Sequence, residues 1–314
     1  MPSKSSSGNH DLLAKMKDIE ARALERSHSR REQDALTPDD SKNSLPTNII
    51  KLPLWPDAVR AVPNGFLRSA LFGAIAKGKR RYMEREQLAA LDGVQILYTG
   101  QRLDQGDLDV YESVLHAVRL HAMGKQCRIT SYALLKLMGK TDTGKNRATL
   151  HTRIIRLRAN AVEIKQGRYV YIGGLIDEAY KDEETQEWVI VLNPKLRALF
   201  EPDQFTQVEW AVRQKLNGQP LAQWLHGFYA SHAKPYPVKV ETLHRLCGSE
   251  TGELWKFAQT LRKALDTVTG VSESYGEGFH YAIRNDLVYV EKKAKGAQRR
   301  HLAKKASKPR KPRI

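Results

Sequence analysis

The chain has 314 residues, enough for two ordinary domains with tails, and its 52 lysines and arginines against 35 acidic residues give a net charge of +17. Its two cysteines, Cys127 and Cys247, cannot by themselves form a four-ligand zinc site or a disulfide framework. No run of about 18 apolar residues is present and the first residues are polar, so we expect a cytoplasmic protein without a membrane span or secretory signal.

The positive charge is concentrated at the C-terminus. Residues 292–314 contain 11 basic and no acidic residues, whereas residues 52–291 contain 32 basic and 27 acidic residues, a net charge of +5. We interpret residues 292–314 as a disordered basic tail that can contact phosphates without reading sequence. The charge alone is equally compatible with a solvated tail that has no specific role.

Residues 1–51 are expected to form an N-terminal extension. Leu12, Met16 and Ile19 recur at helical spacing among charged residues, which predicts one amphipathic helix over about 10–26, followed by a proline-broken linker. A single apolar stripe must pack against something, so these three residues are candidates for binding a partner.

The rest of the chain predicts alternating helices and strands. In the first half we predict an apolar segment at 66–76, strand residues within 82–98, a helix at 107–123, a strand at 127–129, a helix ending at Gly139, a helix at 145–160, a β-hairpin at 161–172 and a strand at 188–192. In the second half we predict a helix at 220–232, a strand at 238–240, helices at 241–247 and 250–268, and a hairpin at 279–291 around Asn285-Asp286.

Two segments in these halves match each other. Ile129–Gly139 and Val238–Gly248 each open on a β-branched residue, place leucines at the same positions, and end in glycine before a polar turn and a basic helix. Self-similarity of this kind indicates one domain type used twice. The order helix, short strand, helix, basic helix, hairpin is typical of a winged helix-turn-helix. We therefore predict an α+β fold with tandem winged-helix domains at 52–205 and 206–291.

The basic helices are the predicted DNA-reading elements. In the first, Leu150, Ile154 and Leu157 form the core face, and in the second the core stripe includes Leu254 and Phe257. The residues assigned to the opposite faces are Lys145, Thr149, Thr152, Arg153 and Arg156, and then Lys256, Gln259, Thr260 and Lys263. Any surface helix carries lysine and arginine, but the same placement in both halves favours DNA binding. The hairpins add Lys165, Arg168 and Arg284 as candidates for phosphate contact.

The other motifs predict neither an enzyme nor a bound cofactor. Residues 73–80 have the glycine and lysine spacing of a phosphate-binding loop but lack the final serine or threonine that would hold magnesium, so a flexible basic loop is the simpler interpretation. Asp142-Thr143-Gly144 follows polar residues and is interpreted as the turn between two helices. An enzyme that uses nucleotides at the 73–80 loop stays open as an alternative.

From about Leu52 to Glu291 the chain resembles the TrfA family of plasmid replication initiator proteins. The segments that carry the resemblance are 129–139, 142–147, 161–164, 192–194, 220–227 and 240–243. The resemblance implies a bacterial plasmid protein whose two winged-helix domains bind direct repeats, called iterons, in double-stranded origin DNA. It also adds Asn146 and Arg147, within 142–147, to the DNA-binding candidates.

The resemblance further implies local opening of the duplex, contact with single-stranded A·T-rich origin DNA, and a monomer–dimer equilibrium. The partners it implies are the host replicative helicase, the host initiator and the sliding clamp. Clamp-binding peptides in such families end in Leu-Phe, which makes Leu71 and Phe72 candidates, although the early glutamine is missing. The alternative function is a winged-helix transcriptional repressor that binds a single palindrome as a dimer.

Overall fold

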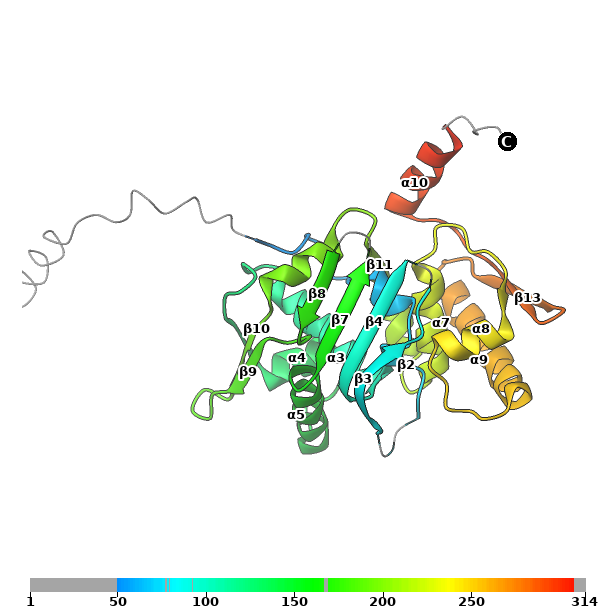
Figure 1. Cartoon of the computed structure of the whole chain (residues 1–314). Coiled ribbons are helices and arrows are strands. Elements are labelled where there is room, and N and C mark those ends of the chain that lie inside the picture. Colours follow the sequence, from blue (N-terminus) through cyan, green and yellow to red (C-terminus); the bar gives the residue numbers. More distant parts are fainter. Residues whose placement is uncertain (1–49, 77, 79, 92, 167–168, 308–314) are drawn as a thin grey trace, which may run out of the picture. The chain divides into compact units, whose positions relative to one another are not determined.

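A computed structural model describes residues 50–307 except 77, 79, 92, 167 and 168. These residues all lie in one unit that spans residues 49–314, and its helices and strands are intermixed in an α+β fold (Figure 1). The helix predicted over 10–26, with Leu12, Met16 and Ile19, lies outside the described residues, as does Arg168.

The chain up to Glu209 contributes most of the strands. Its elements are β1 (Val59–Pro63), α2 (Asn64–Leu67), β2 (Phe72–Gly73), β3 (Tyr82–Leu88), β4 (Val94–Gln101), β5 (Leu103–Asp104), α3 (Gln105–Val118), β6 (Cys127–Thr130), α4 (Ser131–Leu137), α5 (Gly144–Arg158), β7 (Ala161–Gln166), β8 (Tyr169–Gly173), β9 (Glu178–Lys181), β10 (Glu187–Val191), the 3-10 helix η2 (Pro194–Phe200) and β11 (Phe205–Glu209).

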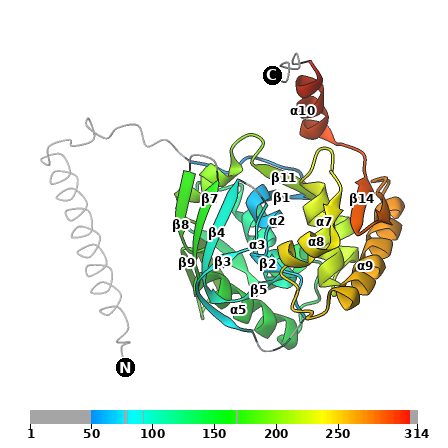
Figure 2. The same cartoon turned by 45° about the vertical axis from the view of Figure 1, so that its right-hand side comes forward.

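The remaining chain is mostly helical, and Figure 2 shows α7, α8 and α9 grouped beside β14. Its elements are α6 (Trp210–Lys215), α7 (Pro220–Ala230), β12 (Val238–Lys239), α8 (Val240–Leu246), α9 (Leu254–Ser274), β13 (His280–Arg284), β14 (Leu287–Glu291) and α10 (Gly296–Ala306).

A four-stranded antiparallel sheet in the order β3-β4-β7-β8 covers one side of the core. Ile96, Ile164 and Tyr171 are paired across neighbouring strands and are buried, whereas Lys165 and Val170 on the opposite face are exposed. This alternation is typical of an antiparallel sheet with one face against the core and one in solvent. In Figure 1 the sheet is seen from its open face, with α3 and α4 behind it.

Two three-stranded sheets share one topology. They have the orders β6-β10-β9 and β12-β14-β13, so in each the strand before the helix pair lies beside the second strand of a hairpin. Trp188 pairs with Ile129 in one sheet, and Val288 pairs with Val238 in the other. We call β6-α4-α5-β9-β10 the first repeat and β12-α8-α9-β13-β14 the second repeat.

This topology corrects one expectation. The predicted hairpin at 161–172 exists as β7–β8, but it belongs to the four-stranded sheet, and the hairpin equivalent to β13–β14 is β9–β10. The sequence of β9, Glu-Ala-Tyr-Lys, carries too few apolar residues to indicate a strand. It is stabilised by pairing with the buried strand β10.

The short helices α4 and α8 end in the same way, which confirms the matching segments seen in the sequence. Gly139 and Gly248 have φ values of 65° and 62°, the left-handed region that glycine enters without steric cost. The N–H groups of the two residues after each C-cap donate to carbonyls of the last helical turn, from Gly139 to Lys136 at 3.0 Å and from Gly248 to Arg245 at 3.1 Å. This Schellman-type ending starts the turn that leads into each basic helix.

The turn predicted at Asn285-Asp286 is also confirmed. Both residues have positive φ, 48° and 59°, and Arg284 pairs with Leu287 across the hairpin. Two positive φ values in succession define the primed turn that suits the twist of a two-residue hairpin.

Several helices differ from the predictions, and α3, predicted over 107–123, already ends at Val118. Within the predicted disordered tail at 292–314, residues 296–306 form α10, because alanine, leucine, glutamine, lysine and arginine are strong helix formers. The helix α9 continues to Ser274, beyond the predicted end at 268, because Val268 and Ser272 pack into the core despite the intervening Gly270. In the part of the chain that the structure describes, no helix is long and apolar enough to cross a membrane.

Buried apolar side chains form two clusters. One runs from Leu52 to Val208 and includes the inner face of the four-stranded sheet, and the other runs from Val212 to Val290 and surrounds α9. The helix α3 is buried along almost its whole length, and its polar residues at the N-terminal end form the contacts described next.

Candidate nucleic-acid interface

The first basic helix, α5, is held by its N-cap and by three buried side chains. Thr143 caps it by accepting a hydrogen bond from the Asn146 N–H at 3.2 Å, which satisfies one of the free donors of the first turn. Leu150, Ile154 and Leu157 are at most 1% exposed, as their spacing predicts. The helix is therefore fixed against the body along one face, and the opposite face is open.

Three of the residues assigned to the open face are exposed: Lys145, Thr149 and Thr152. Arg147 is exposed too, but it makes a two-pronged ion pair with Asp142, at 2.6 Å and 2.7 Å, and its hydrogen bonds lower the pKa of that carboxyl group. Asn146 donates to the Thr141 carbonyl at 2.8 Å, so it stabilises the turn. DNA contact by these residues stays a prediction.

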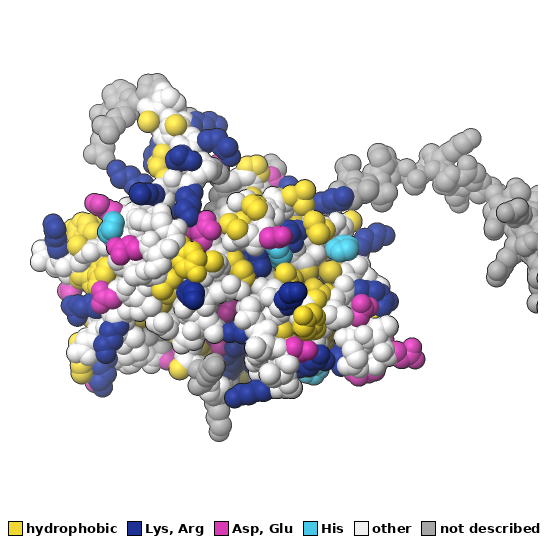
Figure 3. All heavy atoms as spheres, turned by 180° about the vertical axis from the view of Figure 1, so that it is seen from behind, with side chains coloured by type: hydrophobic (Ala, Val, Ile, Leu, Met, Phe, Trp, Pro, Cys, Tyr) yellow, Lys and Arg dark blue, Asp and Glu magenta, His cyan; other side chains and the backbone are white. Residues whose placement is uncertain are grey.

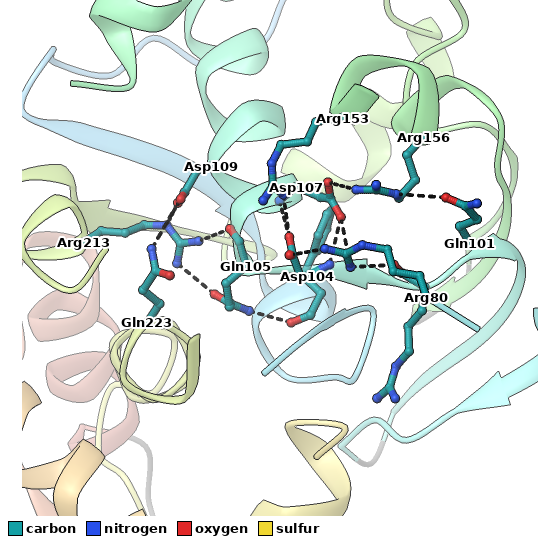
Figure 4. Close-up of polar contacts among 12 residues, drawn as sticks. Arg80, Gln101, Asp104, Gln105, Asp107, Asp109, Arg153, Arg156, Arg213 and Gln223 are labelled. Carbon is teal, nitrogen blue, oxygen red and sulfur yellow. Dashed lines mark hydrogen bonds and ion pairs between the residues drawn. The ribbon is translucent and has the colours of Figure 1, made fainter. Parts of the chain in front are cut away.

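The prediction that Arg153 and Arg156 face outward is wrong. Their side chains are 13% and 11% exposed and point toward α3 (Figure 4). Nη1 of Arg153 lies 2.6 Å from Oδ1 of Asp104 and 2.9 Å from Oδ1 of Asp107, and Nη1 of Arg156 lies 2.6 Å from the same oxygen of Asp107. Both guanidinium groups therefore form ion pairs within the protein.

Helix geometry explains this correction. Successive residues are about 100° apart around a helix, so Arg153 lies only about 60° from Leu150 and about 40° from Leu157. It therefore borders the core face, and Arg156 lies next to it, three residues further along. A side chain at that border can reach an acidic partner on the neighbouring helix if one is available.

The acidic partners cluster at the start of α3. Asp104 is its N-cap and forms a capping box with Asp107, each side chain accepting from the other residue's backbone N–H. Arg80 pairs with Asp104 as well. Burial alone would raise the pKa of Asp104, but the charges and hydrogen bonds of Arg153 and Arg80 lower it. Burial and the charge of Asp104 raise the pKa of Asp107.

A second buried ion cluster joins α3 to α6. Arg213 is fully buried, and its Nε lies 2.7 Å from Oδ1 of Asp109 and 3.0 Å from Oε2 of Glu112 (Figure 4). Its two other nitrogens donate to the side chain and the carbonyl of Gln105, at 3.1 Å and 3.0 Å. Gln223 of α7 lies 3.4 Å from Asp109. Helix α3, which precedes Glu209 in the chain, is therefore bonded to α6 and α7, which follow it.

Glu112 is the member of this cluster whose carboxyl oxygens lack a hydrogen-bond donor among the described residues. The single N–H of Arg213 Nε is directed at Asp109, so neither Glu112 oxygen accepts a hydrogen bond from the described residues despite the short ionic contact. Burial raises its pKa from 4.5 to about 7, against the opposing charge of Arg213. A carboxyl group in this position loses or gains a proton near neutral pH.

The second basic helix, α9, presents the predicted residues. Lys256, Gln259, Thr260 and Lys263 are exposed, and so is Arg284 at the end of β13. Leu254 was expected in the core stripe but is 44% exposed, and Trp255, which sequence reasoning missed, is 58% exposed. Both precede Phe257, the first residue of α9 that is buried, so the core contact begins later than predicted.

Two further assignments change. Lys165 is exposed on β7, in the four-stranded sheet, and so does not belong to the hairpin of the first repeat. The tip of that hairpin, between β9 and β10, instead carries Asp182, Glu183 and Glu184. Leu71 and Phe72 are 1% and 0% exposed, and Phe72 stacks on Tyr111 at 6.2 Å, so their assignment as a partner-binding pair is wrong.

The sequence raised two other kinds of site, one for a nucleotide at the segment 73–80 and one for a metal ion. The segment after β2 leads to strand β3, and its described residues include no helix that could receive a phosphate. Within the described ranges, no three His, Cys, Asp or Glu side chains gather as a metal ion would require. A further basic surface is α10, at the upper left of Figure 3, where lysine and arginine side chains lie among apolar and uncharged ones; its exposed cations include Arg299, Arg300, Lys304 and Lys305.

The fold and this surface define an α+β protein that presents two basic helices from a repeated strand–helix–helix–hairpin arrangement. The sequence profile described as "TrfA protein" matches residues 21–292. Because this match covers most of the chain, the protein belongs to the TrfA family.

One curated relative is the plasmid replication initiator protein TrfA of Escherichia coli, 26% identical over 249 residues. The match covers 76% of this chain and 63% of that protein, so the chain spans less than two thirds of its relative. Solved structures that are similar include domains 2 and 3 of RctB, with TM-score 0.49, 14% identity and coverage of 74% of this chain and 96% of that one. Another is the Pi initiator protein in complex with iteron DNA, with TM-score 0.43, 10% identity and coverage of 60% and 91%.

The buried ion cluster around Arg213 leads to a prediction about stability. Arg213→Met is expected to lower the free energy of unfolding by about 3–5 kcal/mol, because it leaves the Asp109 carboxylate buried without its counter-charge. Urea denaturation measures this, with the exposed Arg284→Met as the matched control, which should change stability by less than about 0.5 kcal/mol. A loss as small as that of the control would contradict the ionic role of Arg213.

A second prediction concerns pH. Glu112 has a folded pKa of about 7 against 4.5, so the folded protein binds the extra proton between these values. The stability that this proton contributes is complete below about pH 4.5 and is lost as the pH rises through about 7. The unfolding free energy of the wild type minus that of Glu112→Gln should therefore fall over this range and then level off. A difference that is constant or rises with pH would show that Glu112 is ionised throughout.

Proposed function

We propose that this protein is a plasmid replication initiator that binds iterons in double-stranded origin DNA and promotes opening of the adjacent duplex. The observation that carries the proposal is the repeated arrangement, in which a short helix ends at a left-handed glycine and leads into a basic helix, in a member of the TrfA family. The relative in Escherichia coli bears the name of a plasmid replication initiator. No catalytic step is assigned to the chain itself.

Each repeat forms the centre of a winged-helix domain in this proposal, one within residues 52–205 and the other within 206–291. The division is supported by the two apolar clusters, which end at Val208 and begin at Val212. Helices α5 and α9 would enter successive major grooves, since the second helix of a helix-turn-helix reads base edges there. Two such helices in one chain suit a site longer than one turn of DNA, about 10 base pairs.

Helices α5 and α9 would contribute unequally to DNA binding. With Arg153 and Arg156 held by α3, the open face of α5 presents Lys145, Thr149 and Thr152, whereas α9 presents Lys256, Gln259, Thr260 and Lys263. The hairpin tip of the first repeat is acidic, so it would be repelled by phosphates, and α9 with its hairpin residue Arg284 would make the firmer DNA contact. The basic α10 would add contacts that do not depend on sequence.

Opening would follow from several bound copies. Bending a binding site costs on the order of 1–6 kcal/mol, which protein–DNA contacts must supply. The strand separation would then occur in A·T-rich DNA beside the iterons, where the single strands and the host helicase, host initiator and sliding clamp would be engaged. Only a monomer–dimer equilibrium that leaves both basic helices accessible is compatible with this arrangement.

Footprinting on the plasmid's own origin tests the proposal. We expect protection of an array of direct repeats, together with permanganate-reactive thymines in the neighbouring A·T-rich segment. Protection of a single palindrome without reactive thymines would instead identify a transcriptional repressor.

The role of α9 gives a further prediction. Lys263→Ala should weaken binding to iterons and to unrelated duplexes by a similar factor, and should lower the slope of log affinity against log salt by about one. Fluorescence anisotropy over a range of salt concentrations measures both effects. Lys195→Ala, which removes another exposed lysine, from η2, is the control; an unchanged slope in Lys263→Ala would place α9 away from the phosphates.

A further inference from the structure

We propose that Trp255, in the first turn of α9, reads thymine methyl groups in the major groove and so contributes sequence specificity. This inference rests on the proposed function, because it assumes that α9 enters DNA. It is drawn from the exposure of the indole, its place on the helix, and the contrast with the other tryptophans of the chain.

Trp255 differs from the other four tryptophans. Trp55, Trp188, Trp210 and Trp224 are at most 7% exposed. Each of these four also donates its indole N–H to an acceptor 3.0–3.1 Å away. Trp255 is 58% exposed and makes no hydrogen bond to any described residue. An exposed indole whose N–H has no acceptor among the described residues, next to the exposed Leu254, forms an apolar surface of the kind enriched at interaction sites.

The position on α9 places this ring among the polar residues proposed to meet DNA. Trp255, Gln259 and Lys263 follow one another at intervals of four, so they form one stripe along the exposed side of the helix. In a helix-turn-helix the N-terminal residues of the second helix approach the base edges most closely. An apolar side chain at that end meets the 5-methyl group of thymine, the one apolar feature in the major groove.

The neighbouring charges favour a polyanion over an apolar protein partner. The Nζ of Lys256 lies 5.2 Å from the centre of the Trp255 ring and 3.0 Å from the carboxylate of Glu253, and Arg262 and Lys263 are exposed further along the helix. A protein partner that buried the ring would also have to desolvate these cations, whereas DNA pairs them with phosphates. Leu254, 44% exposed beside the ring, extends the apolar surface that would exclude water from the contact.

The test compares the wild type with two variants on two forms of the iteron. Replacing thymine by deoxyuridine, one position at a time, removes a single methyl group and should weaken wild-type binding roughly four-fold at the contacted position, as expected for one buried methyl group. Trp255→Ala should bind the thymine site several-fold more weakly and show no further loss on the uracil site. Trp255→Phe should retain part of the discrimination. Tyr275→Ala, which removes an exposed aromatic ring from the other end of α9, is the matched control.

A second measurement uses the unaltered protein and so does not depend on the folding of a variant. Because Trp255 is the exposed tryptophan, quenching of intrinsic fluorescence by iodide reports mainly on this residue. Saturation with the iteron duplex should suppress that quenching in the wild type and have little effect in Trp255→Phe.

The outcomes separate the inference from the proposed function. If the wild type protects iterons but iodide still quenches Trp255 in the complex, or if the uracil effect persists in Trp255→Ala, the inference is wrong and the function stands. If the wild type has no preference for iterons over unrelated duplexes, the proposed function fails and the inference fails with it.

Discussion

Four acidic side chains at the start of α3 form ion pairs with α5 on one side and with α6 on the other. Asp104 and Asp107 bind Arg153 and Arg156 of α5, and on the other side Asp109 and Glu112 bind Arg213 of α6. Because a buried carboxylate without a counter-charge is costly, each arginine fixes the helix that carries it relative to α3. The orientation of α5 and the attachment of the second half therefore depend on one stretch of about two helical turns.

The arginines of α5 show that a basic helix is not necessarily a basic surface. Of the cations on that helix, two are neutralised by α3 and Arg147 is paired with Asp142, so fewer charges are free than the sequence suggests. Among the described residues, no comparable acidic cluster faces the exposed cations of α9, where Lys256 pairs at 3.0 Å with Glu253, the N-cap of the same helix.

Local chemistry was predictable from the sequence, and long-range pairing was not. The glycines at 139 and 248, the Asn285-Asp286 turn and the core face of α5 each follow from a local rule of geometry or spacing. By contrast, Arg153 and its partner Asp104 are 49 residues apart, and β9 becomes a strand only by pairing with β10. The exposure of Trp255 depends on where the core contact of α9 begins, which single-sequence periodicity leaves uncertain by about one turn.

The central place of α3 also limits how such proteins can be recombined. A chimera that joined the first repeat of one relative to the second repeat of another would have to match the acidic residues of α3 to the arginine at position 213. A junction placed in the loop after α6, between Lys215 and Pro220, would keep Arg213 with Asp109 and Glu112; of this ion cluster, Gln223 alone would come from the second parent. The exposed residues of α9 can in this way be exchanged while the buried ion pairs of α3 remain those of one parent.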